Sequence, residues 1–328
     1  MAQTLRLKFD PNQPHQLGAI ESAVRLFEGL SRCVVEFQLG EDIVANLPPL
    51  EELTPLWLLD NLNSVQAANG LETSHTLEFD TGPGLPGAMD ENHRYPNFTV
   101  EMETGTGKTY VYLRTIYELH RHFGFSKFIV VVPSIAIFEG VLKNLEITRD
   151  HFRALYDNEE LGVTQYDGAQ LSRLRSFATY SSIQVLIITL DSLNKRSNVI
   201  YRASEKLPGE LKPYQYIQAT RPILILDEPQ NMESELARQA LRTLKPLFAL
   251  RYSATHRSSP NPIYRLTPFD AFQRNLVKRI QVVGVTERGA EDQPLLTLKE
   301  IALTRGIRAT VRTRVTDLLG TSEKDVVL

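Results

Sequence analysis

The stretch that decides the fold is Met102-Glu103-Thr104-Gly105-Thr106-Gly107-Lys108-Thr109. It follows an apolar segment that we predict as a strand, residues 98–102, and it opens a segment that we predict as a helix, residues 109–122. Gly105 and Gly107 allow backbone N–H groups to turn inward around phosphate oxygens, where a Cβ atom would obstruct them. The helix N-terminus adds the positive end of its dipole. The stretch therefore predicts a phosphate-binding loop.

The polar side chains of this loop have separate predicted roles. In the general GxxxxGK[ST] pattern, the lysine reaches the β- and γ-phosphates and the following hydroxyl ligates Mg²⁺. We therefore expect Lys108 to act in catalysis and Thr109 to ligate the metal ion, although Met102 stands where the pattern has its first glycine. The predicted nucleotide-binding residues of the loop are Thr104, Gly105, Thr106, Gly107, Lys108 and Thr109. The alternative is a glycine-rich turn that only links a strand to a helix.

A second motif joins an apolar run to two acids, because residues 223–226 lead directly into Asp227-Glu228-Pro229-Gln230. A strand that ends in this way places the acids at the carboxyl edge of the sheet, where open α/β folds bind ligands. Buried carboxylates are costly unless they hold a cation or a proton in transit. We expect Asp227 to hold Mg²⁺ through water, and Glu228 to orient and deprotonate the attacking water, with Gln230 in the same catalytic set. The alternative is a solvated acidic turn before a helix.

Short apolar runs alternate with helical patterns over the middle of the chain. The runs cover residues 98–102, 128–132, 185–189 and 223–226, and the helical patterns cover 109–122 and 135–146. Runs that are apolar on both faces are typical of strands in a parallel sheet that is covered on both sides. We therefore predict a three-layer α/β domain with a central, mainly parallel sheet.

The segments on either side of this region have a different sequence pattern. We expect an amphipathic helix over residues 16–30, a second helix over 53–70, and a loop over 81–87, where glycine and proline are concentrated. Later segments are a strand-like run at 280–285, a charged turn at 288–294 and a strictly alternating run at 307–315. Strict alternation is typical of a half-buried antiparallel strand. Residues 281–328 are therefore predicted to form a small β-rich appendage.

The composition excludes several classes of protein. The 328 residues carry 36 Lys and Arg against 39 Asp and Glu, a net charge of −3, which rules out a wholesale basic coat for nucleic acid but not a local basic groove. Cys33 is the single cysteine, so an intrachain disulfide and a cysteine-rich zinc site are excluded. The longest apolar stretch is broken by Pro133 and Ser134 and is far shorter than the ~20 residues that a membrane span needs. We expect a soluble cytoplasmic protein.

A third motif, Arg251-Tyr252-Ser253-Ala254-Thr255-His256, is weak by itself but follows the other two in a recognisable order. The ordered set resembles the first RecA-like motor domain of superfamily 2 DEAD/DEAH-type helicases. More narrowly, it resembles the restriction (Res) subunit of type III restriction–modification systems, and Met102 before the loop is usual in that family. The narrower resemblance spans about residues 10–285 and is carried by residues 98–119, 127–134, 145–148, 227–230 and 251–256.

The resemblance implies roles for further residues. Gln16, in Pro14-His15-Gln16, looks like the glutamine that reads the adenine edge; the alternative is a polar residue at a helix start. Pro133, Ser134 and Thr189 resemble contacts to the DNA backbone, for which simple strand capping is the alternative. The resemblance also implies that the third motif couples the acidic motif to DNA. The coupling residues are then Ser253, Thr255 and His256.

The resemblance also implies an organisation and an activity. Residues 1–97 are expected to be an N-terminal part of the motor, 98–280 a RecA-like P-loop NTPase domain, and 281–328 an appendage before a missing second RecA-like domain and nuclease. The implied function is the ATP- and Mg²⁺-dependent DNA helicase or translocase motor of a type III restriction endonuclease subunit, with DNA and a methyltransferase (Mod) subunit as partners. An arginine finger from a second domain is worth about 10³ to 10⁵ in rate, so we expect weak hydrolysis by this piece alone.

Two other functions stay open at this point. One is a nucleotide-binding but catalytically incomplete module that serves as a scaffold and docks a methyltransferase partner. The other is a superfamily 2 helicase that is unconnected with restriction.

Overall fold

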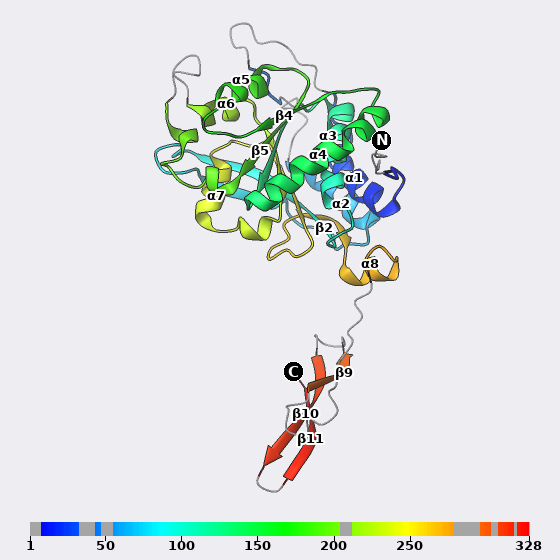
Figure 1. The fold of residues 1–328 in the computed structure, drawn as a ribbon. Helices are drawn as coiled ribbons and strands as arrows, with labels where there is room; N and C mark the ends of the chain where they lie inside the picture. The colour runs from blue at the N-terminus through cyan, green and yellow to red at the C-terminus, as the bar shows by residue number, and fades with distance from the viewer. Residues whose placement is uncertain are drawn as a thin grey trace, which may run out of the picture. The chain divides into compact units, whose positions relative to one another are not determined.

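The chain folds into two compact units, Met1–Lys278 and Arg279–Leu328. The structure is a computed structural model that describes residues 8–32, 43–46, 55–203, 212–278, 296–302, 308–317 and 320–327. Figure 1 shows the first unit as a sheet covered by helices and the second as a small sheet of its own. Within the described residues, no helix is long and apolar enough to cross a membrane.

An eight-stranded sheet forms the centre of the first unit. Its strands are β1 (Phe79–Pro83), β2 (Asn92–Met102), β3 (Lys127–Val132), β4 (Leu161–Gln165), β5 (Ile183–Thr189), β6 (Ile223–Asp227), β7 (Ala249–Ser253) and β8 (Pro262–Leu266). They follow the order β1-β2-β7-β6-β3-β5-β4, and β8 pairs with β2. Each of these pairings is parallel except that of β1 with β2. The strand β7 therefore separates the strand of the phosphate loop, β2, from the strand of the acidic motif, β6.

Helices cover both faces of this sheet. They are α1 (Pro14–Arg25), α2 (Pro55–Ala68), α3 (Lys108–Phe123), α4 (Ile135–Leu155), α5 (Ser172–Thr179), α6 (Pro213–Ala219), α7 (Glu235–Arg242) and α8 (Pro268–Gln273), with 3₁₀ turns at Leu190–Ser192, Val199–Tyr201 and Pro229–Asn231. One hydrophobic cluster contains residues of α1 to α4 with Val185 and Ile187 of β5. A second contains residues of α5 to α7 with Leu186 and Ile188 of the same strand. Because successive residues of a strand point to opposite faces, this confirms the predicted three-layer α/β fold.

The predicted loop at residues 81–87 is wrong in part, because β1 continues through Thr81, Gly82 and Pro83. β1 lies at one end of the strand order and pairs with β2. An edge strand tolerates proline, since its open side needs no N–H donor. A Cβ atom at Gly82 would stand 2.7 Å from Nη1 of the buried Arg242, so glycine is required there for close approach rather than for a loop.

Several elements differ from their predicted bounds. β2 begins at Asn92 rather than at residue 98, and α4 continues to Leu155 rather than ending at residue 146. α1 ends at Arg25, short of the predicted residue 30. In α2, Leu62 is buried, whereas Leu56 is 75% exposed.

The second unit contains a three-stranded antiparallel sheet in the order β11-β10-β9. Its strands are β9 (Leu296–Ala302), β10 (Arg308–Asp317) and β11 (Gly320–Val327). β10 corresponds to the alternating run that predicted an antiparallel strand; Val311 is buried, and Arg312 donates to Asp325 at 2.7 and 3.0 Å. The predicted elements at 280–285 and 288–294 lie outside the described residues.

Candidate functional site

The predicted site residues follow the carboxyl ends of neighbouring strands. In a parallel sheet these ends share one edge, which is where open α/β folds bind ligands. Five strands of the structure end at this edge. The strands β2, β3, β5, β6 and β7 end at Met102, Val132, Thr189, Asp227 and Ser253 respectively.

The loop between β2 and α3 is held in a tight turn. Gly105 and Gly107 have φ of +82° and +95°, a conformation that other residues rarely adopt. The Thr106 hydroxyl and amide both donate to the Glu103 carbonyl, at 2.6 and 3.2 Å. A Cβ atom at residue 107 would stand 2.4 Å from Nε2 of Gln16, so this glycine also makes room for a neighbouring side chain.

The lysine of this loop contacts the acidic motif directly. Lys108 Nζ lies 3.1 Å from Glu228 Oε1, and the two side chains are only 11% and 24% exposed. Glu228 adopts φ of +56°, a strained conformation of the kind that concentrates at functional sites. Burial opposes ionisation of Glu228, but hydrogen bonds from Gln230 and Ser253 and the charge of Lys108 outweigh it and lower its pKa. Glu228 is therefore a carboxylate at neutral pH.

Asp227 has a different environment from its neighbour. It is 5% exposed, and Oδ2 accepts a hydrogen bond from the Tyr112 hydroxyl of α3 at 3.2 Å. Burial, followed by the charge of Glu228, raises its pKa to about 6. The described Lys and Arg side chains form no ion pair with Asp227, although the hydrogen bond from Tyr112 and the charge of Lys108 favour its ionised form. A carboxylate in this situation, near the Thr109 hydroxyl, fits an oxygen-ligated divalent cation.

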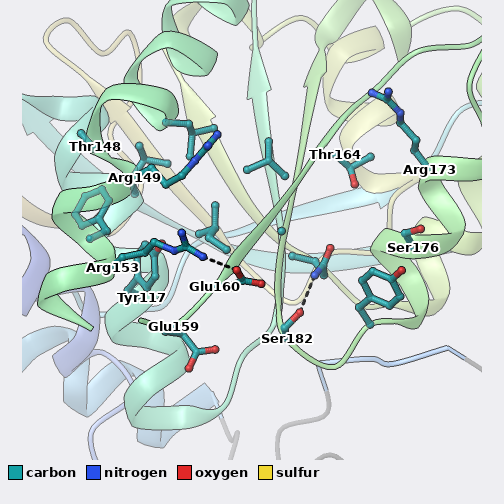
Figure 2. Close-up of a pocket in the computed structure, with 18 residues that line it drawn as sticks. Tyr117, Thr148, Arg149, Arg153, Glu159, Glu160, Thr164, Arg173, Ser176 and Ser182 are labelled. Atoms are coloured by element: carbon teal, nitrogen blue, oxygen red, sulfur yellow. Dashed lines mark hydrogen bonds and ion pairs between the residues drawn. The ribbon is translucent and has the colours of Figure 1, made fainter. Parts of the chain in front are cut away.

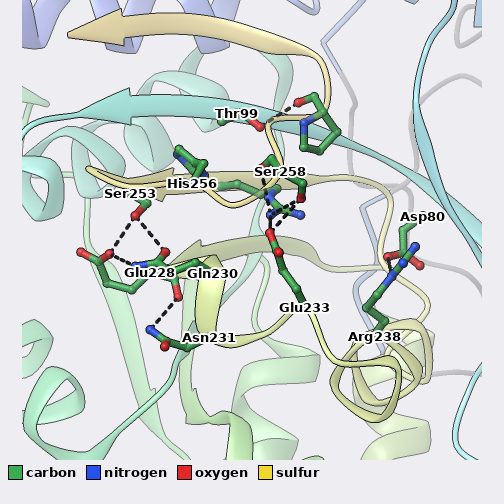
Figure 3. Close-up of polar contacts among 12 residues, drawn as sticks. Asp80, Thr99, Glu228, Gln230, Asn231, Glu233, Arg238, Ser253, His256 and Ser258 are labelled. Carbon is green, nitrogen blue, oxygen red and sulfur yellow. Dashed lines mark hydrogen bonds and ion pairs between the residues drawn. The ribbon is translucent and has the colours of Figure 1, made fainter. Parts of the chain in front are cut away.

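A small hydrogen-bond network joins the acidic motif to the third motif (Figure 3). The Ser253 hydroxyl lies 2.8 Å from Glu228 Oε2 and 2.9 Å from Gln230 Oε1, and Gln230 Nε2 donates to Glu228 Oε2 at 2.8 Å. The backbone N–H of Thr255 donates to the Ser253 oxygen at 3.1 Å. These hydrogen bonds connect the loop after β7 to the Glu228 carboxylate.

The third coupling candidate, His256, lies apart from this network. Its Nε2 faces the Val100 carbonyl at 3.3 Å, and its buried Nδ1 has no partner among the described residues. Burial lowers its pKa, so the imidazole is neutral at pH 7. Thr255 is exposed and reaches Ser253 through its backbone.

An ion pair that the motifs did not predict also fastens the loop after β7. Arg251 Nη2 donates to Glu233 Oε1 at 2.7 Å, and the Ser258 hydroxyl donates to the same oxygen at 2.8 Å (Figure 3). Glu233 follows the acidic motif, so it ties the acidic segment to β7 and to the loop beyond. No residue spacing in the sequence signals this pair.

Two side chains of α1 support the phosphate loop. Gln16 Nε2 donates to the Thr106 carbonyl at 3.1 Å, and His15 Nε2 lies 3.0 Å from the same oxygen. Gln16 thus contacts the predicted phosphate loop, and its role at the adenine edge stays a prediction. The motifs assign no role to His15, because a single hydrogen bond to a backbone carbonyl has no recognisable residue spacing. Its neighbour Gln16 was the available signal.

The predicted DNA-contacting residues stand at the ends of β3 and β5. The Ser134 hydroxyl caps α4 by accepting from the Ile137 amide at 3.4 Å, and it is exposed. Thr189 Oγ1 lies 2.9 Å from the Ser192 hydroxyl. Pro133 joins β3 to α4. These capping contacts are those that the alternative interpretation expects, and both hydroxyls remain at the edge of the sheet.

The cleft beside the loop and the acids measures about 720 Å³. Its lining includes residues that the motifs did not predict, such as Phe9, Asn144, Asn275 and Leu276. Another hollow, about 660 Å³, lies beside β4 between α4 and α5 (Figure 2). No predicted site residue lines that second hollow.

Comparison with known proteins gives one family. The family model "Type III restriction enzyme, res subunit" matches residues 58–258, well over half of the chain. The chain is 27% identical over 290 residues to the Res subunit of the type III restriction–modification enzyme EcoP15I from Escherichia coli, covering 83% of this chain and 28% of that protein. It is 31% identical over 252 residues to the StyLTI Res subunit from Salmonella typhimurium, covering 64% of this chain and 25% of that protein. The chain thus spans about a quarter of the length of these curated relatives.

Solved structures are more distant. The Sulfolobus solfataricus SWI2/SNF2 ATPase core in complex with dsDNA aligns with a TM-score of 0.33 at 15% identity, covering 67% of this chain and 35% of that one. The fold of this chain is defined by its own strand order.

Proposed function

Because the chain belongs to the family of type III restriction enzyme Res subunits, we propose that its helicase-type motor domain binds ATP with Mg²⁺ and hydrolyses it to move on DNA. The observation that carries the proposal is the 3.1 Å contact between Lys108 and Glu228. It places the lysine of a phosphate loop and a carboxylate that can act on water in one cleft, although the residues are far apart in sequence. Phosphoryl transfer depends mostly on such positioning and on charge stabilisation.

Each residue of the cleft has a part in this proposal. Thr109 and Asp227 are the side chains that fit Mg²⁺, whose charge, when bound, neutralises the β- and γ-phosphates. Lys108 turns from Glu228 to the phosphates as nucleotide enters, which frees the carboxylate to orient the attacking water and accept its proton. Gly105, Gly107 and the first turn of α3 direct backbone N–H groups at the phosphate oxygens.

DNA and a modification subunit are the proposed partners. Ser134 and Thr189 stand at the sheet edge where backbone phosphates can be contacted by hydroxyl groups. Ser253 touches both Glu228 and the loop that carries Thr255, so DNA contacts and hydrolysis can be coupled through one hydroxyl. The proposed partnership with a Mod subunit rests on family membership alone. The same holds for DNA cleavage by a complete enzyme.

The test is nucleotide binding and turnover by purified protein. We expect the purified chain to bind a fluorescent ATP analogue with Mg²⁺ and to hydrolyse ATP. Lys108→Ala should abolish binding, because the lysine is the main cation facing the phosphates. Binding that is unchanged in Lys108→Ala would contradict the proposal and favour the scaffold alternative.

A further inference from the structure

We propose that Tyr112 is a positioning residue for the divalent cation of this cleft, because its hydroxyl orients the carboxylate of Asp227, one of the two predicted cation ligands. This inference rests on the proposed function, and it assigns a role to a residue outside the three motifs that define the site.

The position of Tyr112 in α3 makes this contact possible. It lies one helical turn after Lys108 and three residues after Thr109, so these side chains share one face of the helix. Its side chain is fully buried, and its hydroxyl donates to Asp227 Oδ2 at 3.2 Å across 115 residues of sequence. The phenol hydroxyl therefore holds one predicted cation ligand, and the other, Thr109, lies on the same face of α3.

The contact also leaves the carboxylate in a useful arrangement. Oδ2 of Asp227 is held by Tyr112, whereas Oδ1 accepts no hydrogen bond from the described residues. Lys108 pairs with Glu228, and none of the described Lys and Arg side chains forms an ion pair with Asp227. One oxygen is thus oriented and the other is available to a cation or to its bound water. Groups that hold a ligand in this way change metal affinity by about 10- to 100-fold when they are removed.

A purely structural role for Tyr112 makes a different prediction. Its ring packs against Tyr252, with ring centroids 5.6 Å apart, inside the hydrophobic core. If packing is its whole function, removing the hydroxyl changes stability but not cation affinity. Tyr252 supplies a matched control, because it is equally buried and its hydroxyl faces Thr115 Oγ1 at 3.4 Å rather than Asp227.

The experiment compares Tyr112→Phe with Tyr252→Phe in the full chain. Mn²⁺ is titrated into metal-free protein carrying a non-hydrolysable ATP analogue, and the free ion is measured by electron paramagnetic resonance. Affinity for the analogue in EDTA is measured separately. We expect Tyr112→Phe to weaken Mn²⁺ binding about tenfold with unchanged metal-free nucleotide affinity, and Tyr252→Phe to change neither.

Two outcomes overturn the inference: Mn²⁺ affinity in Tyr112→Phe that equals the wild type, or an equal loss in both variants. A double-variant cycle with Asp227→Asn provides a second measurement. In that background Tyr112→Phe should cause no further loss of Mn²⁺ affinity, and an additive loss would show that the phenol acts elsewhere. A wild-type chain that binds neither nucleotide nor Mn²⁺ contradicts the proposed function instead, so the two failures are distinguishable.

Discussion

Replacing Glu228 by Gln should tighten nucleotide binding while stopping turnover. The carboxylate holds Lys108 at 3.1 Å in the structure, so the lysine must leave this partner before it can reach a phosphate. Gln keeps the size of the side chain and can still bond to Ser253 and Gln230, but it removes the charge that attracts Lys108. It also cannot accept a proton from water.

The size of the gain follows from the geometry. At an effective dielectric constant of about 20, two unit charges 3.1 Å apart attract by roughly 5 kcal/mol. Most of this is offset by the hydration that each group regains on separation. Hydrogen bonds to charged groups contribute about 1.5–3 kcal/mol net, and partial exposure of both side chains places this pair at the lower end. We therefore expect about tenfold tighter ATP binding and a fall in turnover of about 10²- to 10⁴-fold.

The assay combines titration of a fluorescent ATP analogue with steady-state phosphate release. Glu233→Gln is the matched control, because it also removes a partly buried acid from the same segment, but one that pairs with Arg251. Glu233→Gln should leave analogue affinity close to that of the wild type, because Glu233 does not line the cleft. Weaker binding in Glu228→Gln, or turnover at the wild-type rate, would refute the reasoning.

Two further predictions concern the loop and the acidic strand end. Gly107→Ala should weaken nucleotide binding at least tenfold and lower the free energy of unfolding by about 1–3 kcal/mol, because φ is +95° and the new Cβ atom meets Gln16; wild-type affinity and melting temperature in this variant would contradict it. Asp227, with a pKa of about 6 against 3.8 for the free side chain, should cost metal-free protein up to about 3 kcal/mol of stability. Because its folded pKa is raised, this cost is absent below pH 3.8, grows as the pH rises and is complete above pH 6. Melting curves in EDTA should show the wild type losing stability relative to Asp227→Asn over this range, and a pH-independent difference would exclude the effect.

The local sequence determined the parts of the site that depend on neighbours along the chain. Gly105 and Gly107 between an apolar run and a helical pattern predicted a strand, a tight turn and a helix N-terminus, because glycine spacing and hydrophobic periodicity are local properties. The four apolar residues before Asp227 likewise predicted a buried strand that ends in acids. These segments match β2, α3 and β6 in the structure. Family membership, predicted from the order of the motifs, is confirmed by the comparisons.

Only the tertiary structure decided which of these segments touch. The strand order places β7 between β2 and β6, and this brings Ser253 to Glu228 and lets Lys108 meet the same carboxylate. The contact between Tyr112 and Asp227 likewise joins residues that are far apart in the sequence. Periodicity shows which face of an element is buried, but not which strand will be its neighbour, because pairing depends on the packing of the whole sheet. The pairing of β1 with β2 also depends on the packing of the whole sheet, which is why residues 81–83 form a strand where the sequence predicted a loop.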